Sequence, residues 1–214
     1  YYAAAATLYG GEARGGYQYD GQVYMGRNMH VEGYTACADC HNPHTTELRL
    51  TECATCHEDV ESVEDLRDIR MQGSNVDFDG DGDDNEGIAG EIEGMQEALY
   101  AAMQAYASEV LGAPIAYDSH TYPYFFNDTD GNGELDEAEA VSDNGYASFS
   151  ANLERAAYNY QVSQKDPGAY AHNPQYVIEL LYDSTMSLSA ALQAPVAEVE
   201  FIVRDAPMHF NPTV

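Results

Sequence analysis

Four cysteines and two histidines form a repeated pattern that indicates the chemistry of this chain. Each of two Cys-x-x-Cys pairs is followed directly by a histidine, in the groups Cys37-Ala38-Asp39-Cys40-His41 and Cys53-Ala54-Thr55-Cys56-His57. Two thiols at this spacing can form thioethers with the two vinyl groups of a haem, and the adjacent imidazole then points at the iron. The pattern therefore predicts two covalently attached haem c groups.

Two other kinds of site also use paired cysteines. Two Cys-x-x-Cys pairs can bind one zinc ion through four thiolates, and paired thiols can form redox-active or structural disulfides. Neither kind of site requires a histidine directly after both pairs, and the chain has only 7 histidines in 214 residues. The haem interpretation is therefore favoured, and it uses all 4 cysteines.

The spacing of the two motifs predicts that the haems are neighbours. Only the segment 42–52 separates His41 from Cys53, and an extended chain advances at most about 3.3–3.6 Å per residue. Haem is attached covalently after export, so the motifs imply an extracellular or cell-surface protein, with the periplasm as the alternative. The chain begins without a basic signal-peptide segment, which fits the expectation of a processed product.

Three further histidines are candidates for the second axial position of the irons. His30 precedes the first motif by a short segment that contains Gly33, and His172 stands directly before a helix start at Asn173-Pro174. His44 follows His41 too closely to reach the far face of the same haem, so it is a ligand only for the second haem or for a haem in another chain. His120 and His209 are expected to have no such role. Met29 is the alternative thioether ligand.

These segments resemble known multihaem proteins. Cys-x-x-Cys-His-Asn-Pro-His at 37–44, followed closely by the second motif, resembles the paired haem segments of multihaem c-type cytochromes. The segment 172–181 resembles a helix of the nitrite reductase and hydroxylamine oxidoreductase-like group, in which the histidine before Asn-Pro is a distal haem ligand. The resemblance covers residues 30–70 and 168–185. Those enzymes carry more haems and an open catalytic iron, so it implies electron transfer here and does not imply their catalysis.

An acidic segment fits the calcium loop of an EF-hand throughout its length. Residues 128–139 match the pattern Asp-x-[Asp/Asn]-x-[Asp/Asn]-Gly-x5-Glu. Side chains, one backbone carbonyl and one bridging water would supply oxygen ligands, and the last residue would bind through both carboxylate oxygens. The predicted ligands are Asp128, Asp130, Asn132, Glu134 (through its carbonyl), Asp136 and Glu139.

A second acidic segment begins in the same way and then departs from the pattern. Residues 77–83 supply alternating aspartates, but the twelfth position is Ile88 and not glutamate. Glu86 or Glu91 is expected to complete the shell from a nonstandard position. So many carboxylates would repel one another without a cation, and we expect structural calcium in both loops. The predicted ligands here are Asp77, Asp79, Asp81, Asp83 and Glu91.

The composition excludes several classes of partner. The formal net charge is -29, from 37 acidic and 8 basic residues, and such a surface repels nucleic acid and anionic membranes. No apolar run reaches the roughly 18 residues that a membrane-spanning helix needs. Redox proteins with a basic surface, or further copies of this chain, are the expected partners.

Periodicity in the sequence predicts a mainly helical fold with small β pieces and a core packed around the haems. We expect an N-terminal arm at 1–29, a dihaem helical domain with both calcium loops at 30–194, and a C-terminal strand or tail at 195–214. Helices are predicted at 58–71, 88–110, 149–160 and 174–188, with a hairpin at 17–24 and a strand at 199–203.

Three functions compete at this point. The first is an electron carrier or conduit, and a polymer similar to the extracellular cytochrome filaments of the multihaem class is one form of it. The second is an oxidoreductase with an open haem that acts on a small nitrogen, sulfur or peroxide compound; six-coordinate haems would exclude it. The third is a calcium-dependent binding module with incidental haems, whose loss would affect adhesion and not electron flow.

Overall fold

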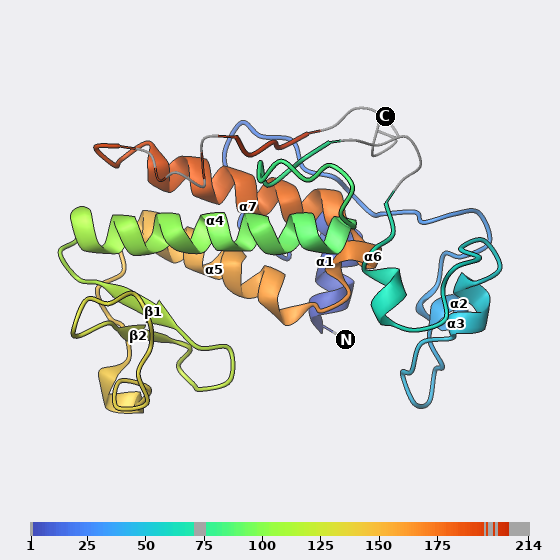
Figure 1. Cartoon of the computed structure of the whole chain (residues 1–214), viewed down its shortest axis with the longest axis horizontal. Helices are drawn as coiled ribbons and strands as arrows, with labels where there is room; N and C mark the ends of the chain where they lie inside the picture. Colours follow the sequence, from blue (N-terminus) through green and yellow to red (C-terminus); the bar gives the residue numbers. More distant parts are fainter. Residues whose placement is uncertain (1, 71–75, 195, 197–198, 200, 206–214) are drawn as a thin grey trace.

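The computed structural model describes residues 2–70, 76–194, 196, 199 and 201–205 (Figure 1). The fold is mainly helical with one small antiparallel sheet, as the sequence predicts. Its helices are α1 (Tyr2–Ala13), α2 (Cys37–Cys40), α3 (Leu50–Cys53), α4 (Ile88–Glu109), α5 (Ala151–Lys165), α6 (Ala169–His172) and α7 (Pro174–Ser189). Its strands are β1 (Ile115–Tyr117) and β2 (Phe125–Asn127), and its 3₁₀ turns are η1 (Glu64–Leu66) and η2 (Ser142–Asn144).

Three long helices, α4, α5 and α7, pack against one another and form the hydrophobic core (Figure 1). Apolar side chains recur along α4 at spacings of three and four residues, which places them on one face of a helix. Met95, Leu99 and Met103 are fully buried on this face, and Leu153 of α5 and Leu181 of α7 lie in the same cluster. Three of the four helices predicted from the sequence, at 88–110, 149–160 and 174–188, are therefore confirmed.

Polar residues fix the starts of two of these helices. The Ser150 hydroxyl accepts a hydrogen bond from the backbone N–H of Leu153 at the start of α5. The Asn173 side chain accepts one from the N–H of Tyr176 at the start of α7, where Pro174 is the first helical residue. Each such cap stabilises a helix by about 1 kcal/mol, so the start of α7 directly after His172 is well defined.

The small sheet lies at one end of the helical bundle (Figure 1). β1 and β2 pair in antiparallel register, with Ala116 opposite Phe126. The loop 128–139 follows β2 directly, so one end of that loop is held by the sheet. These two short strands were not predicted from the sequence.

The N-terminal arm is built differently from its prediction. It begins with α1, which the sequence analysis missed, and residues 17–24 form no hairpin. A turn is present at Asp20-Gly21, and the N–H of Tyr19 donates to the hydroxyl of Tyr24 at 2.9 Å, but the flanking residues form no strand ladder and are attached to the helices. The N–H of Tyr17 donates to Asn159 at 2.6 Å, and the hydroxyl of Tyr24 donates to Asp183 at 2.6 Å. Side-chain acceptors on α5 and α7 thus replace the strand ladder.

Two further predicted elements are wrong. The segment 58–71 contains only the short turn η1 among its described residues, because the Asp65 carboxylate accepts the N–H groups of Glu61 and Ser62 and holds them in a nonhelical turn. The described residues of 199–203 form no strand. The backbone N–H of Val203 donates to the carbonyl of Phe78 at 2.8 Å and attaches that segment to the 77–91 loop.

The segment that carries both cysteine motifs lies at the opposite end of the molecule from the sheet (Figure 1). No residue of 30–57 is buried, and none belongs to the hydrophobic core. Side chains of α4, α5 and α7 bury one another in the hydrophobic core of the described residues, and the contribution of haems to the core stays a prediction. None of the described helices is long and apolar enough to cross a membrane.

Candidate functional site

The two cysteine motifs share one backbone hydrogen bond, although α2 spans the first motif and α3 ends at the first cysteine of the second. In the first, the N–H of His41 donates to the carbonyl of Cys37 at 2.8 Å. In the second, the N–H of His57 donates to the carbonyl of Cys53 at 2.9 Å. Each histidine is thereby held one turn beyond the first cysteine of its motif, which is the arrangement that two thioethers and one iron ligand from a single segment require.

The motifs lie side by side, as their spacing predicts. The helices α2 and α3 pack together. The N–H of Arg49, directly before α3, donates to the carbonyl of Cys40 at 2.8 Å, and His41 forms a β-bridge with Leu48. The intervening segment therefore folds back on itself and brings the second motif next to the first.

The four thiols do not converge on a common point. All four cysteines are free, with Cys37 and Cys56 exposed and Cys40 and Cys53 half-buried. Partial burial raises the pKa of both Cys40 and Cys53. Within the described residues, groups of three or more side chains that are close enough to share a metal ion consist of carboxylates only. The arrangement does not fit a four-thiolate zinc site.

Each motif histidine faces one histidine from a distant part of the chain. The ring centroids of His57 and His30 are 6.1 Å apart, and those of His41 and His172 are 6.2 Å apart. Two imidazole nitrogens that each lie about 2 Å from one metal place their ring centroids roughly 6 Å apart. The donor set therefore fits one haem iron between the rings of each pair.

The remaining candidates are not part of these pairs. His44 is exposed and lies against no histidine ring among the described residues, and its backbone N–H donates to the side-chain oxygen of Asn42 at 2.9 Å. Met29 is 54% exposed. The His120 side chain is exposed and lies near Asp118. His209 lies outside the described residues.

Hydrogen bonds fix which nitrogen of two rings is available as a ligand. Nδ1 of His41 lies 2.9 Å from the carbonyl of Thr46, and Nδ1 of His172 lies 2.9 Å from both carboxylate oxygens of Asp166. A carbonyl and an ionised carboxylate only accept hydrogen bonds, so Nδ1 carries the proton in both rings. Nε2 then presents its lone pair, which is the form that binds a metal.

The corner between α5 and α7 positions His172. Asp166 caps the C-terminal end of α5, and its carboxylate also accepts the N–H of Gly168 at 3.2 Å. Burial would raise the pKa of Asp166, but its hydrogen bond with His172 holds that pKa below its ordinary value. A Cβ at Gly168 would lie 2.9 Å from Cε1 of His172, so this glycine makes room for the ring.

The same corner positions the segment that carries His30. The side-chain amide of Asn173 donates to the carbonyl of Gly26 at 2.9 Å, and that of Asn28 donates to the carbonyl of His172 at 2.9 Å. The N–H of Met25 donates to Glu179 of α7 at 2.7 Å. The arm is thus attached to the bundle immediately before His30.

The two acidic loops have the same internal hydrogen bonds at equivalent positions. The first aspartate of each loop accepts the N–H groups of two glycines that have positive φ angles. Asp77 accepts from Gly80 at 2.6 Å and from Gly82 at 2.9 Å. Asp128 accepts from Gly131 at 2.7 Å and from Gly133 at 2.9 Å. The loop that departs from the sequence pattern therefore shares the backbone conformation of the loop that matches it.

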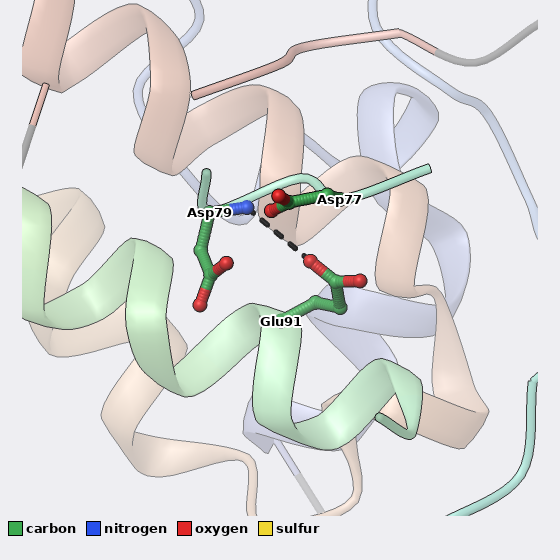
Figure 2. A group of neighbouring side chains, drawn as sticks. All are labelled: Asp77, Asp79 and Glu91. Atoms are coloured by element: carbon green, nitrogen blue, oxygen red, sulfur yellow. Dashed lines mark hydrogen bonds between the residues drawn. The ribbon is translucent and has the colours of Figure 1, made fainter. Parts of the chain in front are cut away.

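The carboxylate that closes each loop is also equivalent. In the matching loop, Glu139 accepts the N–H of Thr129, the second loop residue, at 2.6 Å. In the other loop, Glu91 of α4 accepts the N–H of Phe78, again the second residue, at 2.6 Å. Figure 2 shows Glu91 pointing at Asp77 and Asp79 from the helix. Helix α4 thus brings a glutamate to the place that the sequence pattern reserves for the twelfth residue.

The loops differ in how their charge is balanced. Glu91, which is completely buried, also forms an ion pair with Arg70, whereas no ion pair with a basic side chain is seen for Glu139 among the described residues. Burial, with nearby carboxylates adding to it, raises the pKa of Asp79 to about 6 and that of Glu86 to about 7.

Among the described residues, the carboxylates converge in three groups, two of them in the 77–91 loop. Glu86, which the sequence analysis gave only as an alternative to Glu91, belongs to one of these groups. The groups are Asp77, Asp79 and Glu91; Asp79, Asp81 and Glu86; and Asp128, Asp130 and Glu139. The predicted ligands Asp83, Glu134 and Asp136 lie in the same loops but outside these groups, and Asn132 donates to Asp130 at 3.1 Å.

Relatives of this chain are found among polyhaem c-type cytochromes. The chain is 27% identical over 172 residues to OmcB of Geobacter sulfurreducens, a C-type polyheme cytochrome present in two strains, and this match covers 69% of the chain and 20% of OmcB. It is 32% identical over 107 residues to OmcC of the same organism, also a C-type polyheme cytochrome, with 46% of the chain and 13% of OmcC covered. No protein-family model and no solved structure match it.

The chain spans about a fifth of the length of OmcB. The similarity therefore concerns a part of a longer relative. In this part the chain is similar to polyhaem c-type cytochromes, and it carries two Cys-x-x-Cys-His motifs with a histidine that faces each of them.

Proposed function

We propose that this chain is an extracytoplasmic electron-transfer protein that carries two closely spaced haem c groups. The observation that carries the proposal is the presence of one facing histidine for each motif histidine, His30 for His57 and His172 for His41. Haem supplies one-electron redox chemistry when it is bound. The relatives are polyhaem cytochromes, which agrees with this role.

Ligation by two histidines favours electron transfer over substrate chemistry, because both axial positions of the iron are filled. In this proposal, Cys37 and Cys40 hold one haem and Cys53 and Cys56 hold the other. The alternative, an oxidoreductase for a small nitrogen, sulfur or peroxide compound, needs one open iron position. It gains no support from the geometry, since neither motif histidine lacks a partner.

The remaining histidine supports a weaker extension of the proposal. His44 is exposed beside the first motif, so it is available to a haem of a second copy in a conducting polymer. Each motif histidine already faces a histidine of its own chain, and polymerisation is therefore not needed to complete either site. Cryo-electron microscopy at high protein concentration tests the extension, and particles that remain monomeric would end it.

The two acidic loops are proposed to bind one calcium ion each. Support comes from their common hydrogen-bond pattern and from the closing glutamates, Glu139 in one loop and Glu91 in the other. Oxygen ligands suit calcium, and extracellular calcium is sufficient for weak sites. The 128–139 loop follows β2, and the 77–91 loop ends in α4, so the ions would stabilise both ends of the helical bundle.

The central experiment measures the haems of the purified chain. A pyridine haemochrome assay is expected to give two haems per chain, and denaturing mass spectrometry should find both bound covalently. Optical and electron paramagnetic resonance spectra should show six-coordinate low-spin iron, with no carbon monoxide binding by the reduced protein. Absence of porphyrin, or a zinc ion held by the four sulfurs, would overturn the proposal.

A further inference from the structure

The two facing histidine pairs differ in what their ring nitrogens contact. In the first pair, Nδ1 of His172 is bonded to both oxygens of Asp166, while Nδ1 of His41 is bonded only to the neutral carbonyl of Thr46. In the second pair, His30 and His57 have no ring hydrogen bond to a carboxylate within the part of the chain that the structure describes. Among the described residues, a carboxylate is therefore hydrogen-bonded to an imidazole of the His41–His172 pair but to neither imidazole of the His30–His57 pair.

Asp166 is a buried and fixed charge. Its side chain is 2% exposed, and its position at the end of α5 is held by the N–H of Gly168. Within the described residues, His172 is the only side chain with which it forms an ion pair. Its charge consequently acts on the imidazole at short range and with little screening by water or salt.

A hydrogen bond from a ligating imidazole to a carboxylate makes the imidazole a stronger electron donor. Stronger donation stabilises ferric iron relative to ferrous iron, and second-sphere hydrogen bonding is one of the ways in which proteins set haem potentials. Among the described residues, Glu47 instead accepts from the Thr45 hydroxyl and Glu52 from the Tyr34 hydroxyl, and neither is hydrogen-bonded to a ring nitrogen of the four histidines.

We propose that Asp166 is a positioning residue that lowers the reduction potential of the haem held by His41 and His172, and makes it the more reducing of the two. This inference rests on the proposed function. An electron on that haem would then move to the haem held by His30 and His57, which oxidises the first iron and reduces the second without any transfer of atoms. The chain would thus have a preferred internal direction of electron flow.

The test is a potentiometric titration of the holoprotein and of Asp166→Asn, followed in the visible absorption of the haems. Asparagine keeps an oxygen that can accept from Gly168 and from Nδ1 of His172, so the variant removes charge while it keeps shape. The wild type is expected to titrate in two waves. In the variant, the ratio of reduced to oxidised haem at a fixed potential should rise about tenfold in the lower wave. This corresponds to an upward shift of its midpoint potential by about 59 mV for one electron. The midpoint potential of the upper wave should not change.

Three controls assign the effect. Glu47→Gln removes one exposed charge from the loop between the motifs, and it should move neither wave appreciably. Asp166→Glu restores the charge and should return the lower wave toward its wild-type position. His30→Met should move the upper wave, since methionine ligation raises a haem potential, and this identifies the haem to which each wave belongs.

The outcomes separate this inference from the proposed function. If the wild type lacks two low-spin, six-coordinate haems, the proposed function itself fails. If both haems are low-spin but Asp166→Asn moves the upper wave, both waves equally or neither wave, the proposed function stands and the role of Asp166 is overturned. A shift in Asp166→Asn that Asp166→Glu does not reverse would also count against it.

Discussion

The side-chain amide of Asn28 donates a hydrogen bond of 2.9 Å to the backbone carbonyl of His172. This bond joins the arm, two residues before His30, to the corner that carries the other proposed distal ligand. Asn173 strengthens the junction through its bond to Gly26. Two histidines that lie far apart in the sequence, His30 and His172, are therefore positioned by one set of contacts.

Replacement of Asn28 by alanine should weaken this junction. The variant loses one partly buried hydrogen bond, so the free energy of unfolding should fall by about 1 kcal/mol, measured by urea denaturation of the holoprotein. The spectrum of the haem at His57 should gain a high-spin component, because His30 is held less firmly. Gln22→Ala, at an exposed position of the same arm, is the control. Equal behaviour of the two variants would contradict the role of Asn28.

Removal of single histidines should separate the two proposed haem sites. In His172→Ala, the haem at His41 is expected to become high-spin and to bind carbon monoxide when reduced, while the other haem stays low-spin. His30→Ala should show the reverse assignment. His44→Ala is the matched control, because His44 faces no histidine ring in the part of the chain that the structure describes, and its spectrum should equal that of the wild type. A high-spin signal in His44→Ala would show that the proposed pairing is wrong.

Calcium should stabilise the protein through the 128–139 loop. A ligand present at about 100 times its dissociation constant adds roughly 2.7 kcal/mol to the free energy of unfolding, and calorimetry with and without a chelator measures the effect. Glu139→Gln should remove the share of the effect that comes from the 128–139 loop, because Glu139 lies against Asp128 and Asp130. Glu137→Gln changes an exposed neighbour outside that group and should retain it. Equal calcium affinities of the two variants would count against this site.

In the 77–91 loop, bound calcium should compensate for the loss of Arg70. Arg70→Gln leaves the charge of Glu91 buried without its basic partner, which costs about 3–5 kcal/mol of stability in the absence of calcium. Calcium supplies positive charge at the same carboxylate, so it should offset much of this loss.

The matched control for Arg70 is Arg67→Gln, in the same segment. Arg67 and Glu93 form an ion pair that is largely exposed, and such pairs contribute about 1 kcal/mol or less. This variant should lose little stability, and calcium should affect it as it affects the wild type. If calcium stabilises the two arginine variants equally, Glu91 does not contribute to a cation site.

Glu179 should make the stability of the protein depend on pH. Burial between α7 and the arm raises the pKa of Glu179 to about 7, above its ordinary value of 4.5. The folded state then binds this proton more tightly than the unfolded state, so the contribution is fully present below pH 4.5 and is lost as the pH rises to about 7. The change corresponds to roughly 3 kcal/mol.

The measurement is the free energy of unfolding from pH 4.5 to pH 8. Glu179→Gln should reduce the loss of stability between pH 4.5 and pH 7 by its own share, whereas Glu154→Gln, at an exposed position of α5, should leave the loss unchanged. Parallel curves for wild type and Glu179→Gln would contradict the raised pKa.

Much of the chemistry was readable from the sequence because it depends on residues that are close together in the chain. Three sets of features are local patterns of this kind. They are the cysteine spacing, the glycine and aspartate positions of the 128–139 loop, and the periodicity and caps of α4, α5 and α7. Two local patterns gave wrong predictions. The alternation at 17–24 predicted a hairpin and the amphipathic spacing at 58–71 predicted a helix, but side-chain acceptors hold both segments in other conformations.

Only the tertiary structure decided which distant groups meet. The sequence offered three distal histidines without a pairing, and packing of the arm and of the α5–α7 corner against the motifs placed His30 opposite His57 and His172 opposite His41. Tertiary packing likewise brought Glu91 to the 77–91 loop and Asp166 to His172. These contacts join segments that are remote in the chain. They depend on how the helices bury their apolar faces, and no local pattern specifies that packing.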